Sequence, residues 1–154
     1  MQFSLAPSPA LAQVTGMDAD LVQLVEVSRS PALLPALAPD ATLAAEAQRW
    51  AETMARTRTL QHSPQLQRLL ELGFDRAGEN VGYSTQSLHA VVRGFDLSPS
   101  HRRNMLDPQW TSVGVGVVEQ GAELFVVVLF GTRSDTRAAR RNRSGQSRVM
   151  AISA

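Results

Sequence analysis

The spacing of apolar residues predicts helices along the first two thirds of the chain. Apolar side chains recur every three or four residues, the period of an amphipathic helix, in segments that follow capping residues such as Asp18 and Asp40. The dipeptides Ser63-Pro64 and Ser98-Pro99 place proline where the first turn of a helix tolerates it. Five helices are therefore expected, over about 18–29, 40–56, 63–73, 86–95 and 98–106.

The last third of the chain carries the pattern of a β-hairpin. Residues 111–118 alternate apolar with small side chains, which predicts a strand with one apolar face. Gln120-Gly121 forms a turn, and the apolar run 124–130 fits a central strand covered on both faces. Residues 78–83 are typical of a short strand or a tight extended loop. Helices first and an antiparallel hairpin last predict an α+β fold in which helices cover the sheet.

Composition divides the chain into three parts. Its 154 residues, 44% hydrophobic and 19% charged, are typical of one globular domain, which we assign to residues 17–131. Residues 1–16 are uncharged and rich in proline, alanine and serine, as in a flexible N-terminal arm. Residues 132–154 are rich in arginine and are expected to form a disordered tail with salt-sensitive attraction to polyanions. No specific nucleic-acid-binding motif is present.

The sequence excludes an integral membrane protein but leaves the compartment open. No apolar run approaches the ~20 residues that a membrane-spanning helix needs. The first residues lack the basic region of a signal peptide, although Ala10-Leu11-Ala12 has the small-x-small form of a cleavage site. Because the chain has no cysteine, it offers neither a disulfide nor a thiolate metal site.

Three polar residues are candidates for chemistry, and each has a structural alternative. His62 ends the long helical region, where histidine is also common as a surface or capping residue. Glu79 lies in a Gly-Glu-Asn segment that either turns the carboxylate inward or forms a plain turn. His101 falls in the first turn of a helix, whose dipole favours the neutral imidazole that binds metals, but it also fits a helix cap. His89 is interpreted as a surface or packing residue.

Four motifs together resemble the bacterial branch of the CAP superfamily, which comprises cysteine-rich secretory, antigen-five and pathogenesis-related proteins. The motifs occupy residues 60–63, 77–82, 98–106 and 113–117. The helix around 47–51 and the strand ending at Gly131 are also similar to their counterparts in that family. The resemblance covers about 18–131, and the four motifs in this order are far more specific than any one alone.

The resemblance implies a three-layer α-β-α sandwich with a small antiparallel sheet and a shallow cleft that holds two histidines and acidic residues. His62 and His101 match the histidines, which in several members bind a divalent ion such as zinc. Glu79 matches the acid of the Gly-Glu-Asn motif and is the candidate catalytic residue. With only two protein ligands, zinc or another divalent cation would be weakly bound. The resemblance also implies an extracellular or cell-envelope location.

The chain departs from the family pattern at several positions. Animal and plant members usually carry a second glutamate before the later histidine, whereas here no glutamate occurs between Glu79 and Glu119. Asp96 is the one acid near that stretch. Phe95 replaces the usual tryptophan and Ser100 the usual glycine. The missing acid argues against general acid–base catalysis, since one carboxylate would have to serve alone.

Three functions stay open at this point. The first is a non-enzymatic binding module, zinc-loaded or not, for a lipid, glycan or protein ligand. The second is an accessory component of a larger virion or cell-envelope assembly. The third is a metal-assisted hydrolase that uses His62, His101 and Glu79. The arginines after His101, Arg102 and Arg103, are either an anion-binding pair or a solvated one.

Overall fold

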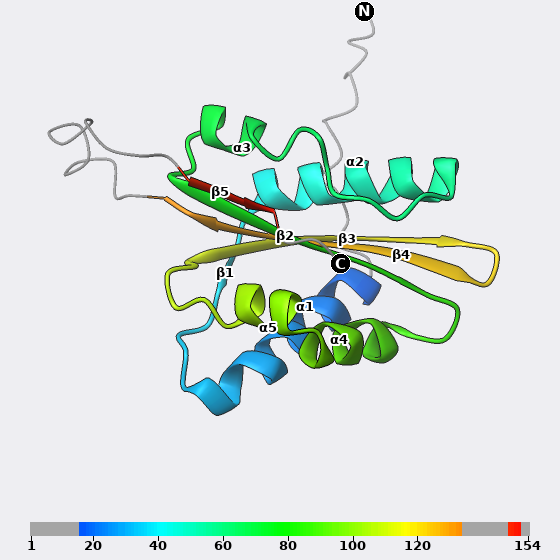
Figure 1. Ribbon diagram of the computed structural model, residues 1–154, viewed down its shortest axis with the longest axis horizontal. Coiled ribbons are helices and arrows are strands. Elements are labelled where there is room, and N and C mark those ends of the chain that lie inside the picture. The colour runs from blue at the N-terminus through cyan, green and yellow to red at the C-terminus, as the bar shows by residue number, and fades with distance from the viewer. Residues whose placement is uncertain (1–15, 134–147, 152–154) are drawn as a thin grey trace, which may run out of the picture.

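The protein is built in three layers, as the computed structural model in Figure 1 shows for residues 16–133 and 148–151. A β-sheet forms the middle layer, with α2 and α3 on one face and α1, α4 and α5 on the other. The helices are α1 (Gly16–Arg29), η1 (Ser30–Ala32), α2 (Ala41–Thr57), α3 (Arg68–Glu71), α4 (Leu88–Leu97) and α5 (Pro99–Met105). Each layer of helices therefore packs its own apolar core against one face of the sheet.

The sheet has five described strands in the order β1-β3-β4-β2-β5. They are β1 (Ala38–Pro39), β2 (Arg76–Ser84), β3 (Ser112–Gln120), β4 (Glu123–Thr132) and β5 (Arg148–Ala151). The three long strands β3, β4 and β2 pair antiparallel, while β1 joins β3 and β5 joins β2 in parallel. Strand β2 therefore has β4 on its inner edge and β5 on its outer edge.

Helix α2 lies directly on the backbone of β3 because glycines remove the side chains beneath it. A Cβ atom on Gly114 would lie 2.1 Å from the backbone nitrogen of Ala44. On Gly116 it would lie 2.5 Å from the carbonyl carbon of Ala47. Asp40 is the N-cap of the helix, and its Oδ1 accepts hydrogen bonds from the backbone amides of Thr42 and Leu43. The two glycines set the height of α2, and so the position of the loop that follows it.

Arg29 fastens the end of α1 to the end of α5. Its side chain is 0% exposed. Nη1 donates to the carbonyl oxygen of Met105 at 2.7 Å, and Nη2 donates to that of Pro35 at 3.2 Å. A buried carbonyl oxygen needs a hydrogen-bond donor. The Arg29 guanidinium supplies that donor to both of these carbonyl groups. Arg29 therefore holds α5, the helix that carries His101, against α1.

The predicted α+β three-layer fold is confirmed, with corrections at the edges of the sheet. Strand β2 is longer than the expected segment 78–83, and the short strands β1 and β5 were not predicted. Strand β5 lies within the predicted tail, 132–154, and pairs with β2 in parallel. The arm, residues 1–15, and the other tail residues, 134–147 and 152–154, lie outside the described residues.

Candidate functional site

Glu79 is a buried carboxylate on β2 that faces the α2 layer. Successive side chains of a strand point to opposite faces, and Ala77 and Val81 on either side of Glu79 pack in the α2 core. The Glu79 side chain is 0% exposed. Its Oε1 accepts the backbone amide of Ser63 at 2.9 Å and lies 2.8 Å from Nδ1 of His62. Its other oxygen, Oε2, has no hydrogen-bond partner among the described residues.

His62 is held against Glu79 by the loop that follows α2. Trp50 on α2 donates its indole Nε1–H to the carbonyl oxygen of Gln61 at 2.9 Å, which fixes the residue before His62. Because a carboxylate oxygen only accepts, Nδ1 of His62 is the donor toward Glu79. The His62 side chain is 21% exposed and is the most accessible of the three candidates.

His101 lies on α5 and is almost buried, at 6% exposure. Its Nδ1 is 2.9 Å from the hydroxyl oxygen of Ser98, and its ring centroid is 5.0 Å from that of Phe95. Nε2 has no hydrogen-bond partner among the described residues. Burial, and then the charge of His62, lower the pKa of His101 from its usual 6.5. The folded protein therefore favours neutral His101 near neutral pH, the form that binds metals.

A chain of buried amides fixes α5 onto β2. Asn80, next to Glu79, donates from Nδ2 to the carbonyl oxygen of His101 at 3.1 Å. Asn104 donates from Nδ2 to Oδ1 of Asn80 at 3.0 Å. Trp110 donates from Nε1 to the carbonyl oxygen of Asn104 at 2.7 Å. The neighbours Glu79 and Asn80 thus hold the two histidine-bearing segments from opposite faces of the same strand.

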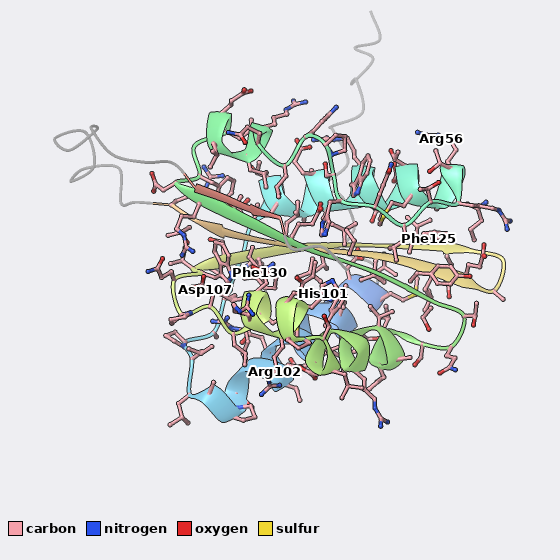
Figure 2. All side chains as sticks on the ribbon, in the orientation of Figure 1. Arg56, His101, Arg102, Asp107, Phe125 and Phe130 are labelled. Atoms are coloured by element: carbon pink, nitrogen blue, oxygen red, sulfur yellow. The ribbon has the colours of Figure 1, made fainter. Side chains whose placement is uncertain are left out.

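The two histidines come from different layers of the protein. His62 lies with Glu79 on the α2 side of the sheet. His101, labelled in Figure 2, is on α5, which packs on the opposite side. The inner edge of β2 is fully paired with β4, so no side chain passes there. The charge of His62 is the second cause, after burial, that lowers the pKa of His101. The structure places His62 against Glu79, and that His101 shares one site with them stays a prediction.

The donor set is sparse for a metal ion. Across the described ranges 16–133 and 148–151, no group of three or more His, Cys, Asp or Glu side chains is arranged to hold one. The imidazoles of His62 and His101 are the two candidate ligands, and the nearby Glu79 carboxylate is engaged by His62. A metal bound here would complete its coordination with water or with a ligand.

A second acid near Glu79 was not recognised from the sequence. Glu46 on α2 and Glu79 both line a small cavity of about 10 Å³, which is enough for roughly one water molecule. Glu46 forms ion pairs with Arg49 and, at 4.0 Å, with Arg68. The signal that points to it is its spacing of four residues from Trp50, which places both on one face of α2. Glu46 is thus already neutralised by arginines.

The other residues that the sequence singled out lie away from the two histidines or serve a structural role. Asp96 accepts a hydrogen bond from the hydroxyl of Ser28 on α1 at 3.0 Å and lies 3.7 Å from Arg102. It therefore binds α1 to α4 and does not replace the missing glutamate. Arg103 is exposed, and His89 is exposed at the start of α4.

A separate groove lies between α1, the start of α4 and the β3–β4 turn. Its volume is about 500 Å³, within the range of small-molecule sites. Met17, Leu24, Leu88 and Leu124 supply apolar surface, and polar residues, His89 among them, complete the lining. None of its lining residues belongs to the His62–Glu79–His101 site, so the two positions are distinct.

Comparison with known proteins decides the family. Residues 22–130 match the model of the family described as CAP, the Cysteine-rich secretory protein family. This chain belongs to the CAP family. Its similarity to the protein YkwD of Bacillus subtilis (strain 168) is 28% identity over 120 residues, which cover 73% of this chain and 47% of YkwD. The chain thus spans about half the length of that relative.

Solved structures share the fold of this CAP domain. An outer surface protein from Borrelia burgdorferi superposes with a TM-score of 0.72 at 23% identity, covering 79% of this chain and 96% of that one. An extracellular protein containing a SCP domain from Bacillus anthracis (strain Ames) superposes with a TM-score of 0.69 at 30% identity, covering 84% of this chain and 45% of that one. In the described part of this CAP domain, no helix is long and apolar enough to cross a membrane.

Proposed function

We propose that this CAP domain is a non-enzymatic binding module, with its ligand site between His62, Glu79 and His101 at the outer edge of β2. The observation that carries the proposal is the state of Glu79: it is fully buried, Oε1 is bound by His62 and Ser63, and Oε2 has no partner among the described residues. A buried polar atom without a partner is costly unless a ligand, ion or water completes it. The ligand belongs to the lipid, glycan or protein class, as in our sequence-based expectation.

Binding fits this site better than hydrolysis does. General acid–base catalysis needs a carboxylate free to move a proton at the substrate. Here Glu79 is committed to orienting His62, and the second nearby acid, Glu46, is paired with Arg49 and Arg68. We therefore assign Glu79 a role in positioning His62 and in accepting a hydrogen bond from the ligand.

Zinc, or another divalent cation, fits the chemistry of the two imidazoles. Both rings have Nδ1 engaged, His62 by Glu79 and His101 by Ser98, so a metal would bind through Nε2 of each. The fold is shared with NaASP2, whose crystal structure contains Zn²⁺, at 14% identity and a TM-score of 0.58. A bound zinc would act as a Lewis acid that attracts an anionic or carbonyl ligand group. With His62 and His101 alone as protein ligands, we expect weak, exchangeable binding.

Calorimetric titration with zinc tests this site. We expect the wild-type chain to give one saturable binding event that is lost in His62→Ala and in His101→Ala, because each removes one of two protein ligands. The matched control is His89→Ala, which changes a surface histidine outside the site and is expected to titrate like the wild type. Equal heats in all four proteins would instead show adventitious binding elsewhere on the chain, and would contradict a zinc site at these two residues.

We also propose that the domain works outside the cell or in the cell envelope. The Bacillus anthracis structure is of an extracellular protein, and this chain matches its SCP domain at 30% identity. The absence of cysteine is compatible with either an oxidising or a reducing compartment. Localisation of the tagged full-length chain by cell fractionation tests this assignment.

A further inference from the structure

The loop that follows α1 is an exposed apolar segment that the proposed function does not use. From Ser30 to Pro39 the chain has no charged side chain. Within residues 31–36, every residue except Leu34 is exposed. Leu33 is 92% exposed, the highest value among the large hydrophobic side chains of the described ranges. A contiguous apolar surface of this kind marks contact with a partner or a membrane.

The backbone of Leu33 adopts a conformation that does not suit leucine. Its φ of 55° and ψ of 31° lie in the left-handed region, which favours glycine and is costly for a residue with a Cβ atom. The backbone alone makes the turn, because the amide of Leu33 donates to the carbonyl oxygen of Ser30 at 3.0 Å. Glycine would make the same turn without strain. A strained and exposed leucine therefore points to a function of its side chain outside the fold.

Hydrogen bonds on the C-terminal side of Leu33 fix the loop onto the domain. Nη2 of the buried Arg29 donates to the carbonyl oxygen of Pro35 at 3.2 Å. The backbone amide of Leu37 donates to Oε1 of Glu26 at 2.8 Å. Glu26 and Arg29 carry opposite charges, so the support of the loop is neutral. Because the loop is held in one conformation, Leu33 is presented to a binding partner with little ordering cost.

Basic side chains lie next to this loop. The guanidinium of Arg29 also donates to the carbonyl oxygen of Met105, so the loop and the end of α5 meet at one buried group. Helix α5 carries the exposed Arg102 and Arg103 and no acidic residue. Arg102, labelled in Figure 2, lies in the same helical layer as the loop. Two exposed cations therefore accompany the apolar segment.

The acids nearest to α5 already have cationic partners. Asp107 forms an ion pair with Arg76 at 3.0 Å, and Asp96 lies 3.7 Å from Arg102. With these two pairs balanced, Arg103 leaves a net positive charge beside the loop. Such a surface attracts anionic partners.

We propose that the loop 31–36, together with Arg102 and Arg103, is a contact surface for an anionic lipid bilayer. Leu33 enters the boundary between the headgroups and the acyl chains, and the two arginines bind headgroup phosphates. The inference goes beyond the proposed function, because none of these residues belongs to the His62–Glu79–His101 site.

A lipid surface fits the loop better than a protein partner does. A stable protein interface buries about 800 Å² on each partner. One protruding leucine among small alanine and proline residues offers much less apolar surface than that. Interfacial membrane contact needs only a few apolar side chains with cations beside them, since apolar burial and attraction to anionic lipid act together.

Replacing Leu33 by glycine tests the role of its side chain. Glycine adopts the left-handed turn without strain, which offsets the greater freedom of the unfolded chain, so the free energy of unfolding is expected to stay nearly unchanged. Binding is measured by cosedimentation with vesicles of phosphatidylglycerol and phosphatidylcholine in equal parts. We expect Leu33→Gly to bind about tenfold more weakly than the wild type, because a leucine side chain no longer leaves water.

The matched control is Leu72→Ala, which changes an exposed leucine at the end of α3, in the opposite helical layer, and is expected to bind like the wild type. All of these proteins keep the arginines of residues 134–154, so any attraction of that segment to anionic lipid is common to them. The double variant Arg102→Gln/Arg103→Gln is expected to bind at least about fivefold more weakly at low salt, with a smaller difference at high salt.

Insertion of the loop is measured with a dye at its tip. Because the chain has no cysteine, Leu33→Cys provides a single attachment point for a polarity-sensitive dye. We expect the emission to shift to the blue when the anionic vesicles are added, since the dye leaves water. The same dye attached to Leu72→Cys is expected to keep its emission.

Two results would overturn the inference. One is equal vesicle binding by the wild type and Leu33→Gly with no emission shift at position 33, which would mean that arginines alone attract the chain to lipid. The other is an emission shift at position 33 that needs no lipid and grows with protein concentration, which would mean that the loop docks on a second copy of the chain.

Discussion

Replacing Gly114 by alanine is expected to destabilise the protein by at least about 3 kcal/mol, because the added methyl group has no space. Its Cβ would lie 2.1 Å from the backbone nitrogen of Ala44 and 2.3 Å from the backbone carbon of Leu43. Backbone atoms of a packed helix do not yield as a flexible side chain does, so α2 as a whole must move off β3. Urea denaturation followed by circular dichroism measures the loss in the free energy of unfolding.

Gly94 provides the matched control for this prediction. It lies on the exposed face of α4, and no atom lies within 4 Å of a Cβ built there. Alanine is favoured over glycine inside a helix by about 0.5–1 kcal/mol, so Gly94→Ala is expected to be neutral or slightly stabilising. Equal effects of the two substitutions would contradict the direct packing of α2 on β3.

Replacing Arg29 by alanine is expected to cost about 3–5 kcal/mol, since it leaves a cavity and removes the partners of buried carbonyl groups. The guanidinium binds the carbonyl oxygens of Met105 and Pro35 while it is 0% exposed. Because Met105 ends α5, we also expect the loss to loosen the helix that carries His101. The midpoint and slope of a urea transition measure the first effect, and amide exchange within α5 measures the second.

Arg102 is the control for Arg29. Its side chain is 52% exposed and 3.7 Å from Asp96, and it lies on the surface of α5 (Figure 2). Exposed ion pairs contribute at most about 1 kcal/mol, so Arg102→Ala is expected to leave stability nearly unchanged. A loss as large as that of Arg29→Ala would show that any arginine near α5 matters, and would contradict the specific role of the buried guanidinium.

The fold was predictable where side-chain periodicity reports burial. The helical spacing around Leu43, Ala47 and Met54 placed α2, and the alternation over β3 placed a strand. The edge strand β1 escaped prediction because its two residues are too few to show a period and pair with β3 through the backbone. The length of β2 was underestimated since its glycines and buried polar residues hide the apolar alternation.

The candidate residues of the site were predictable from the sequence, but the residues that hold them in place were not. His62, Glu79 and His101 were selected because their motifs resemble those of one family, and the structure shows His62 in contact with Glu79. The residues that hold them there are Trp50, Ser98, Asn80, Asn104 and Trp110. Their role depends on contacts between segments far apart in sequence, and a single sequence does not show which distant amides meet.

The central claim is that His62 and His101, from opposite layers, share one site and interact through their charges, and a pH titration of the histidine ring protons by NMR tests it most directly. In the wild type, burial and the charge of His62 are expected to hold the pKa of His101 below 6.5. In His62→Gln that charge is gone, so the pKa of His101 is expected to rise, while His89→Gln leaves it unchanged. The same His101 pKa in all three proteins would contradict the claim.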